Sequence, residues 1–461
     1  MQDLLHGGES ALRQGVTPGQ VHVFEVLGQK LALDVATGSL HLVDDVAAHV
    51  IARHRHVEEN HHALRFPFKA EAVREAEAEV AELIQRGLLF TPDPVPPVPN
   101  LAPPVKALCM NISHDCDLTC GYCFAQQGDF GGERTFMTDE TATGAIDCLV
   151  DQAKTSLLAV DFFGGEPLLN LPAMEAAVAR CRDWERRKDV RFIFTVTTNG
   201  TLLDGPVREF LDRESIRVVL SLDGRPEVHD RFRKTCQGGG SYKQVIDNMR
   251  RLIEDREPDT YYARGTYTRH NLDFSQDVLH MVDMGFSSVS LEPVVSDPSC
   301  PWALTEEDVP TCRAEYERLC EIYLERHRQG RPFTFFHFAV ALDHGPCLPK
   351  RLRGCGAGTE YLAVAPDGRF FPCHQFVGQE QFCLGDVIRG LTGHEVRADM
   401  ARIHALNKSE CSRCWARYHC GGGCHANAYQ FSGDMKKPYT IGCQLQRHRL
   451  ECALYVQAIL A

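Results

Sequence analysis

The stretch Cys116-Asp-Leu-Thr-Cys-Gly-Tyr-Cys-Phe124 carries three cysteines in the spacing C-x3-C-x2-C. It follows an apolar segment at 105–112 that is predicted to be a β-strand. Three thiolates can bind three irons of a [4Fe–4S] cube and leave the fourth iron open. Such an open position is what a catalytic metal centre needs in order to bind a substrate. A zinc site, or three unrelated thiols, is the alternative that this spacing alone leaves open.

The region around this stretch alternates predicted strands and helices. The strands are predicted at 105–112, 157–163, 191–198, 217–222, 262–268 and 288–293, and helices between them at 138–154, 171–187, 241–255 and 273–284. Six repeats of this kind over residues 105–300 predict an α/β fold, with a parallel sheet curled into a partial (β/α)6 barrel. In such barrels the functional residues lie at the C-terminal ends of the strands, which is where the three cysteines fall.

Further short motifs follow the next predicted strands in order. Gly164-Gly165-Glu166-Pro167 follows the second strand, Thr197-Thr198-Asn199-Gly200 the third, and Ser221-Leu222-Asp223-Gly224 the fourth, while Arg264 lies on the fifth. Each motif alone is a weak signal, because glycine-rich turns after strands are common. Their succession, one in each repeat, argues against a purely structural explanation.

With these motifs, and with Tyr122 before the third cysteine, the sequence resembles the radical S-adenosylmethionine (SAM) superfamily. The resemblance implies that SAM chelates the open iron of a [4Fe–4S] cluster held by Cys116, Cys120 and Cys123. Reductive cleavage of SAM would then give a 5′-deoxyadenosyl radical. The resemblance further implies a contact of Ser221 with the ribose and of Arg264 with the SAM carboxylate. The other implied SAM-binding residues are Tyr122, Gly164, Gly165, Glu166, Pro167 and Asn199.

The C-terminal part of the chain, residues 345–461, holds a second group of cysteines. Cys355 and Cys373 precede the run Cys411-x2-Cys414-x5-Cys420-x3-Cys424, and Cys443 follows. This pattern resembles the SPASM domain, which binds two auxiliary [4Fe–4S] clusters. The resemblance implies a first auxiliary set of Cys355, Cys373 and Cys424, and a second set of Cys411, Cys414, Cys420 and Cys443. A zinc ribbon is the alternative for the run at 411–424.

Cys347 lies just before the first of these cysteines. It is a candidate fourth ligand of the first auxiliary cluster. The alternative, equally weighted, is that Cys347 stays free. The cluster would then keep an open iron at which a substrate thiolate could bind.

The segment at 1–91 is predicted to be a separate domain. Segments 21–26, 30–34 and 39–43 predict a three-stranded meander, and a helix follows within 70–90. This order resembles the winged-helix-like leader-recognition domains of natural-product enzymes, which can bind an extended peptide as an added strand. A dimerisation or packing domain is the alternative. The proline-rich residues 92–104 predict a stiff linker. Residues 301–344 predict a helical connection to the cysteine-rich domain, with a long amphipathic helix at 302–330.

Bulk properties exclude several classes of protein. No stretch approaches the roughly 20 apolar residues of a membrane span, and the N-terminus lacks the pattern of a signal peptide. A cytoplasmic location is therefore expected, where thiols stay reduced, so the 20 cysteines indicate metal ligands before disulfides. The net charge of −13 argues against nucleic-acid binding.

Within the superfamily the sequence is most similar to the thioether-forming maturases of the SCIFF peptide, a small ribosomally made peptide rich in cysteine. The segments that carry this similarity are 125–132, 354–364, 372–378 and 414–427. The similarity implies a cysteine-rich precursor peptide as substrate and a ranthipeptide as product. The adenosyl radical would remove a hydrogen atom from an acceptor residue, and a cysteine sulfur of the same peptide would join that carbon. The surplus electron would leave through the clusters, and a ferredoxin or flavodoxin would supply the reducing electron.

Two other enzymes and one non-enzyme remain as alternatives. A maturase of quinohemoprotein amine dehydrogenase also forms thioethers with a three-cluster layout. An anaerobic sulfatase maturase would instead produce formylglycine, but those enzymes carry an Asp directly after the second SPASM cysteine, where this chain has His374. The non-enzyme alternative is a zinc-stabilised peptide-binding adaptor. The sequence assigns no general base.

Overall fold

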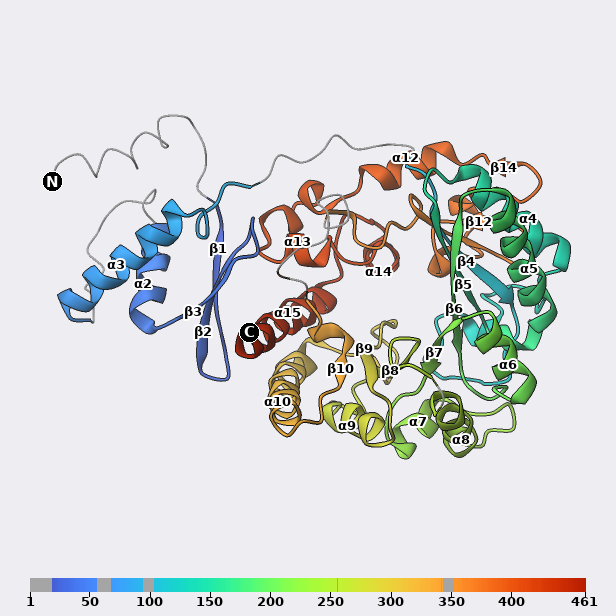
Figure 1. Ribbon diagram of the computed structural model, residues 1–461, viewed down its shortest axis with the longest axis horizontal. Helices are drawn as coiled ribbons and strands as arrows, with labels where there is room; N and C mark the ends of the chain where they lie inside the picture. Colours follow the sequence, from blue (N-terminus) through green and yellow to red (C-terminus); the bar gives the residue numbers. More distant parts are fainter. Residues whose placement is uncertain (1–18, 56–67, 94–102, 255, 341, 343–351) are drawn as a thin grey trace.

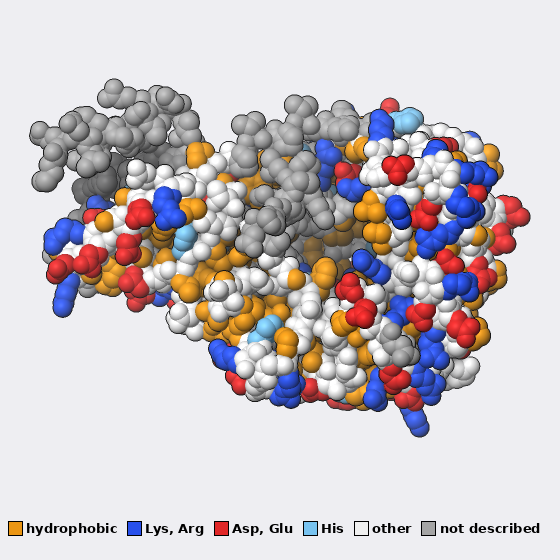
Figure 2. Space-filling view, viewed as in Figure 1, with side chains coloured by type: hydrophobic (Ala, Val, Ile, Leu, Met, Phe, Trp, Pro, Cys, Tyr) orange, Lys and Arg blue, Asp and Glu red, His pale blue; other side chains and the backbone are white. Residues whose placement is uncertain are grey.

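The computed structural model describes residues 19–55, 68–93, 103–254, 256–340, 342 and 352–461. Figure 1 shows the N-terminal elements at one end, a curved sheet with outer helices at the other, and the C-terminal elements between and above them. Over the half that holds the curved sheet, acidic and basic side chains are mixed on the face seen in Figure 2. Within the described ranges, no helix has both the length and the apolar character that crossing a membrane requires.

Six parallel strands lie side by side in chain order, as the repeats predict. They are β4 (Ala107–Ser113), β5 (Leu157–Gly164), β6 (Arg191–Thr198), β7 (Arg217–Ser221), β8 (Tyr261–Tyr267) and β9 (Ser288–Pro293). Helices α4 (Asp139–Gln152), α5 (Leu171–Arg187), α6 (Gly205–Arg213), α7 (Pro226–Phe232), α8 (Tyr242–Ile253) and α9 (Ser275–Asp283) lie on the outside of this sheet (Figure 1). The C-terminal ends of all six strands therefore meet at one edge.

The sheet is larger than the six strands predicted from the repeats. Strand β10 (Thr334–Phe335) adds to β9, β11 (Tyr361–Val364) adds in parallel to β4, and β12 (Phe370–Phe371) pairs with β11. Strand β11 comes from the range assigned to the cysteine-rich domain, and it covers the polar edge that β4 would otherwise expose. A four-residue apolar run has no diagnostic periodicity, so the sequence did not reveal this pairing.

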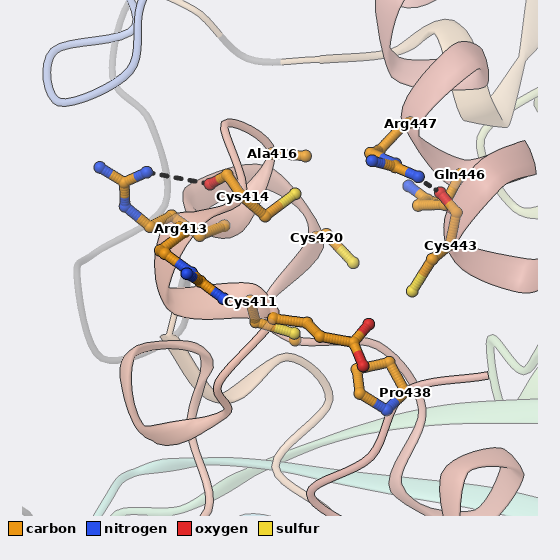
Figure 3. A pocket seen from close by; sticks show the side chains of 12 residues that line it. Cys411, Arg413, Cys414, Ala416, Cys420, Pro438, Cys443, Gln446 and Arg447 are labelled. Atoms are coloured by element: carbon orange, nitrogen blue, oxygen red, sulfur yellow. Dashed lines mark hydrogen bonds between the residues drawn. The ribbon is translucent and has the colours of Figure 1, made fainter. Parts of the chain in front are cut away.

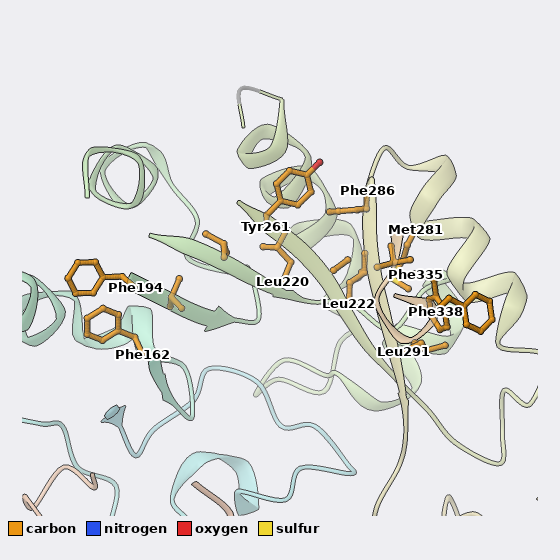
Figure 4. Packing of buried hydrophobic residues seen from close by; sticks show 14 of the residues in the cluster. Phe162, Phe194, Leu220, Leu222, Tyr261, Met281, Phe286, Leu291, Phe335 and Phe338 are labelled. Carbon is orange, nitrogen blue, oxygen red and sulfur yellow. The ribbon is translucent and has the colours of Figure 1, made fainter. Parts of the chain in front are cut away.

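The sheet separates an apolar outer face from a more polar inner face. On β5, Leu158, Val160 and Phe162 point outward and are completely buried under the helices, and Figure 4 shows Phe162 beside Phe194 of β6 in this core. The intervening residues Asp161 and Phe163 point inward and are only partly buried. Because side chains alternate across a strand, the inner face is available to line a site.

Two long helices pack together next to the β9 edge of the sheet. Helix α10 (Val309–Arg328) begins later than the predicted 302–330, because a capping box between Thr305 and Asp308 forms a short turn before Pro310. Helix α15 (Thr440–Leu460) packs along α10. The remaining C-terminal elements are β13 (Gly385–Asp386), β14 (Gly390–Leu391), α12 (His394–Arg402), α13 (Arg417–Cys420) and α14 (His425–Ser432).

The N-terminal elements agree with the predicted meander and helix. Strands β1 (Val21–Val26), β2 (Gln29–Asp34) and β3 (Leu40–Val43) form an antiparallel sheet, followed by α2 (Asp45–Arg55) and α3 (Ala70–Gln85). Val73, Ala76 and Val80 of α3 pack on the sheet. Strand β3 is an edge strand.

The N-terminal elements dock on the cysteine-rich part of the chain. Arg417, which is 3% exposed, binds both carboxylate oxygens of Asp93 at 2.7 and 2.8 Å, and also donates to Gln20 Oε1. The His22 ring of β1 stacks on Trp415 with a centroid distance of 4.0 Å, and His22 Nε2 lies 2.9 Å from Glu451 Oε1. Trp415 and Arg417 both belong to the segment between Cys414 and Cys420.

Replacing Glu451 by Gln should lower the free energy of unfolding by about 1–3 kcal/mol at pH 7. The Glu451 carboxylate lies between His22 and His448, and its second oxygen is 3.2 Å from His448 Nδ1. Burial lowers the pKa of His448, but hydrogen bonds to Cys452 and Glu451 outweigh it and raise the pKa to about 10. The pair therefore stabilises fully between about pH 4.5, the ordinary pKa of Glu451, and pH 6.5, and this stability is lost as the pH rises toward about 10.

Urea unfolding at pH 7 and pH 9 measures this effect. The charged and titratable groups around His448 are Glu451 on its own helix, Cys452, and Glu317 of α10, whose Oε1 is 3.3 Å from His448 Nε2. We expect a smaller loss of stability between the two pH values in the Glu451→Gln variant than in the wild type. The exposed residue Glu321 supplies the control Glu321→Gln. An unchanged unfolding free energy and pH dependence in Glu451→Gln would contradict the prediction.

Candidate active site

The loop that carries Cys116, Cys120 and Cys123 (the first cysteine loop) leaves the C-terminal end of β4. Hydrogen bonds fix it to the end of α7 and the segment that follows. Thr119 N donates to Lys234 O at 2.7 Å, and Gly121 N donates to Phe232 O at 3.0 Å. The three thiols are partly exposed and lie within electrostatic range of one another. Burial raises the pKa of Cys120 to about 11, so iron binding has to displace protons.

Tyr122 anchors the same loop to the end of β7. Its hydroxyl donates a short hydrogen bond to Asp223 Oδ2. Arg233 binds both carboxylate oxygens of Asp223 at 2.9 and 3.1 Å, and Asp223 is 1% exposed. The Tyr122 ring packs against Phe232. The contact of Tyr122 with SAM stays a prediction. In the structure, the Tyr122 hydroxyl binds Asp223 and so holds the loop in place.

The glycines of the Gly164-Gly165-Glu166-Pro167 motif allow two strand ends to approach closely. A Cβ on Gly164 would lie 2.2 Å from Ser113 O, and one on Gly165 would lie 2.2 Å from Asp115 O. Gly164 also has φ +134°, which side chains disfavour. The Gly165 and Glu166 amides donate to the Ser113 and Asp115 carbonyls at 2.8 Å. The motif therefore fixes the backbone just before Cys116.

The Glu166 carboxylate joins the ends of β5 and β6. It is completely buried and accepts hydrogen bonds from Thr198 Oγ1 at 2.8 Å, Asn199 N at 2.8 Å and Leu168 N at 3.1 Å. Burial raises the pKa of Glu166 to about 7. Pro167 begins the short helix η2 (Pro167–Asn170) that follows. A contact of Glu166 with the SAM amino group stays a prediction.

The remaining predicted SAM contacts lie on the next strands. Asn199 Nδ2 donates to Asp117 Oδ1 at 2.8 Å and is 3.9 Å from Cys116 Sγ. Ser221 is partly exposed at the end of β7, and Arg264 is exposed on β8. In the part of the chain that is described, Arg264 forms no ion pair. Its guanidinium is therefore available to an anionic group of a ligand.

Changing Gly165 to Ala should destabilise the fold by about 3 kcal/mol and lower the iron held by the first cysteine loop. The new methyl group would meet backbone atoms of Asp115, which cannot move aside as a flexible side chain can. Thermal unfolding and iron per chain measure the two effects. Gly205→Ala is the matched control, because nothing lies within 4 Å of a Cβ at that position. Unchanged stability and iron content in Gly165→Ala would contradict the packing argument.

The first cysteine loop and the Cys373 segment meet at the inner face of the sheet. Phe124, next to Cys123, has its ring 5.4 Å from that of His374, next to Cys373. The His374 ring also lies 4.9 Å from Phe163, and Tyr361 Oη is 3.4 Å from His374 Nδ1. Burial lowers the pKa of His374 to about 4. The residues that follow two predicted cluster ligands thus share one aromatic wall.

Asp161 is an inward-facing acid that belongs to none of the sequence motifs. Cys109, Asp161 and Thr195 are register partners on β4, β5 and β6. Burial raises the pKa of Asp161 to about 6 although Thr195 hydrogen-bonds to it. No described basic residue forms an ion pair with Asp161. The available signal was a charged residue in the middle of an otherwise apolar strand.

The cysteines predicted for the first auxiliary set lie together around β11 and β12. Cys373 is buried, whereas Cys355 and Cys424 are exposed, and both lie within electrostatic range of Cys373. Strand β11 separates Cys355 from Cys373 in the sequence. Its pairing with β4 joins this part of the chain to the edge of the central sheet. Cys347, the candidate fourth ligand, lies outside the described residues.

The cysteines predicted for the second auxiliary set line one cavity of about 220 Å³. Figure 3 shows the thiols of Cys411, Cys414, Cys420 and Cys443 directed into a common space. They come from helix η8 (Cys411–Arg413) and the residue after it, from the end of α13, and from the first turn of α15. The lining also includes Arg413, Arg447 and Glu410, and Arg417, which is paired with Asp93.

Both auxiliary sets have the donor chemistry that [4Fe–4S] clusters require, because thiolates are their usual ligands. Arg413 and Arg447, which line the second cavity, would also stabilise a negatively charged cluster there. Across the described residues, no group of three or more His, Cys, Asp or Glu side chains is arranged to hold a single metal ion.

Known proteins with similar sequences include several radical SAM enzymes. Residues 110–263 match the model of the radical SAM superfamily. The radical SAM cyclopropyl synthase TigE of Paramaledivibacter caminithermalis is 24% identical over 342 residues, 69% of this chain and 68% of TigE. A cysteine-type anaerobic sulfatase-maturating enzyme of Clostridium perfringens is 29% identical over 340 residues, 70% of this chain and 89% of that enzyme.

The fold also resembles that of a solved structure, native anSMEcpe with bound AdoMet and the Cp18Cys peptide. The TM-score is 0.63 with 21% identity, over 77% of this chain and 99% of the other. The shared feature is the α/β fold with a parallel central sheet.

Proposed function

This chain is a radical SAM enzyme with maturases among its relatives, and from that premise we propose that it installs intramolecular thioether crosslinks in a cysteine-rich, ribosomally made peptide. A peptide cysteine supplies the sulfur, and a carbon of an acceptor residue receives it. The peptide-modifying part of the proposal is supported by the relatives, since one is named as a sulfatase-maturating enzyme and another fold neighbour holds a peptide.

The observation that carries the proposal is the aromatic wall shared by Phe124 and His374. These residues directly follow Cys123 and Cys373, so a radical formed at the first cysteine loop and a sulfur near the first auxiliary set would face the same space. Thioether formation requires this proximity, because the carbon radical and the sulfur have to meet before either reacts elsewhere. A peptide lying along the inner face of β4, β5 and β11 would reach both.

Three [4Fe–4S] clusters and SAM are the proposed cofactors. When bound, SAM would supply a 5′-deoxyadenosyl radical, and the auxiliary clusters would offer a path for the surplus electron. Cys116, Cys120 and Cys123 would hold the first cluster, and the two auxiliary sets would hold the others, with Cys347 as the further candidate ligand. Arg264, whose guanidinium has no ion pair among the described residues, would orient the SAM carboxylate. Tyr122 and the Gly164–Glu166 segment keep the cysteine loop fixed during turnover.

We assign the N-terminal elements to recognition of the precursor peptide. Strand β3 is an edge strand, and its backbone groups can pair with an extended peptide added to the sheet. The docking of His22 on Trp415 and of Arg417 on Asp93 fixes these elements against the C-terminal cysteines. A ferredoxin or flavodoxin is the proposed reductant.

A second candidate, formylglycine formation, is favoured by the sulfatase-maturating relative at 29% identity. This chain departs from those enzymes at His374, where they carry an Asp. The reactions differ in their products. Thioether formation keeps every sulfur and removes a pair of hydrogens for each crosslink, whereas formylglycine formation from cysteine removes the sulfur.

The test is an anaerobic reaction of the reconstituted enzyme with SAM, a reductant and the cysteine-rich peptide encoded nearby, followed by mass spectrometry and thiol labelling. We expect the peptide to lose a pair of hydrogens for each crosslink and its thiols to become unreactive. Omission of SAM is the control. Loss of sulfur would establish the alternative, and an unmodified peptide with steady release of 5′-deoxyadenosine would overturn the proposal for this substrate.

A further inference from the structure

Lys408 is a buried lysine among the C-terminal cysteines. It lies between helix η7 (Ala405–Asn407) and helix η8, and it is only 1% exposed. Its ammonium donates to Gly422 O at 2.8 Å and lies 3.5 Å from His425 Nδ1. No carboxylate of the described residues forms an ion pair with it. The described partners of this ammonium are therefore the neutral carbonyl of Gly422 and a ring nitrogen of His425.

A buried ammonium needs a nearby anion, because removing a charge from water costs several kcal/mol that neutral acceptors do not fully offset. The groups within electrostatic range of Lys408 that would be negative as thiolates are cysteine sulfurs from both auxiliary sets. Cys411, Cys420 and Cys443 belong to the second set, and Cys424 belongs to the first. Clusters bound to these thiolates would carry the missing negative charge.

The local backbone places Lys408 between the two sets. Gly421, Gly422 and Gly423 link Cys420 of the second set to Cys424 of the first, and all three have positive φ of +68°, +87° and +75°. The carbonyl that accepts from Lys408 belongs to the middle glycine. Because a Cβ on Gly422 would lie 3.6 Å from Lys408 Cδ, the lysine stem packs directly on this link. Its ammonium is thus fixed where the two cluster sites adjoin.

We propose that Lys408 is the counter-ion shared by the two auxiliary clusters and that its charge raises their reduction potentials. This inference rests on the proposed function, because it requires that both auxiliary clusters are bound. Reduction adds a negative charge to a cluster, and a fixed cation nearby stabilises the reduced form more than the oxidised form. Lys408 thereby makes the auxiliary clusters better acceptors for the electron that remains when the carbon–sulfur bond forms.

The experiment is a redox titration, monitored by electron paramagnetic resonance, of reconstituted full-length Lys408→Met, Lys408→Gln and Lys408→Arg, with iron counted for each. Met removes the charge and the hydrogen bond, Gln keeps a donor for Gly422 O without the charge, and Arg keeps the charge. The exposed Lys436→Met variant is the matched control for loss of a positive charge elsewhere in this part of the chain.

We expect the Met and Gln variants to titrate at more negative potential than the wild type, and the Arg and Lys436→Met variants to match it. If the Lys408→Met and Lys408→Gln variants lose iron while Lys408→Arg retains it, the result also supports a positive charge at position 408 as a requirement of the clusters. Wild-type potentials in a fully loaded Gln or Met variant would overturn the inference, as would iron loss in all three variants at position 408. A wild type with iron for only one cluster would instead refute the cluster part of the proposed function, and the inference with it.

Discussion

Replacing Cys116, Cys120 and Cys123 together by Ala should abolish cleavage of SAM and remove about four of roughly twelve irons per chain. The three thiols lie on one loop after β4, and no other cysteine lies in that loop. Without the open iron, SAM has no metal to chelate and no electron donor beside its sulfonium. Release of 5′-deoxyadenosine, measured under anaerobic reducing conditions, should fall to background.

A loss of this kind has to be separated from general misfolding. Cys300→Ala is the control, since Cys300 is partly exposed and fits no cluster spacing. It should leave both the iron content and SAM cleavage unchanged. Continued release of 5′-deoxyadenosine by the triple variant would rule out the first cysteine loop as the site of SAM cleavage.

The second large effect is expected from the double replacement Cys414→Ala with Cys443→Ala. These residues lie on opposite sides of the cavity shown in Figure 3, and removing both leaves only two of its four thiols. A cubane cluster cannot be held by the remaining pair. Thioether formation should fall by about 100-fold or more, because the path for the departing electron is broken. SAM cleavage should continue, because the first cysteine loop is distant in sequence and keeps its ligands.

The informative quantity is therefore the ratio of crosslinks formed to 5′-deoxyadenosine released. In the double variant this ratio should fall sharply, whereas in the triple variant of the first loop both quantities should vanish together. Cys383→Ala, a partly buried cysteine in the same part of the chain, is the control. A double variant that crosslinks the peptide at the wild-type ratio would exclude the second auxiliary set from the reaction.

Local patterns in the sequence were sufficient for the strand order. Strands β5, β6 and β9 begin at the predicted residues, because alternating apolar side chains and flanking turns are local signals. The grouping of the C-terminal cysteines came from the resemblance to the SPASM domain, and their role as cluster ligands stays a prediction. The structure gathers Cys411, Cys414, Cys420 and Cys443 around one cavity although Cys443 is far from the others in sequence.

Contacts between distant segments could not be predicted in this way. The pairing of β11 with β4, the stacking of His22 on Trp415 and the position of Lys408 beside Gly422 depend on how separate parts of the chain pack. Sequence patterns also could not reveal that the Tyr122 hydroxyl and the Glu166 carboxylate have protein partners. Both residues were predicted to contact SAM, and their hydrogen bonds show that they also build the framework around the first cysteine loop.

We propose that this fold gathers three cysteine sets for three clusters, two of them serving sulfur and electron transfer. The decisive measurement is iron and acid-labile sulfide per chain after anaerobic purification and reconstitution. We expect roughly twelve of each per chain. About four of each, with zinc bound at the C-terminal cysteines, would keep the SAM-binding cluster but refute the proposal, because neither auxiliary cluster would then exist.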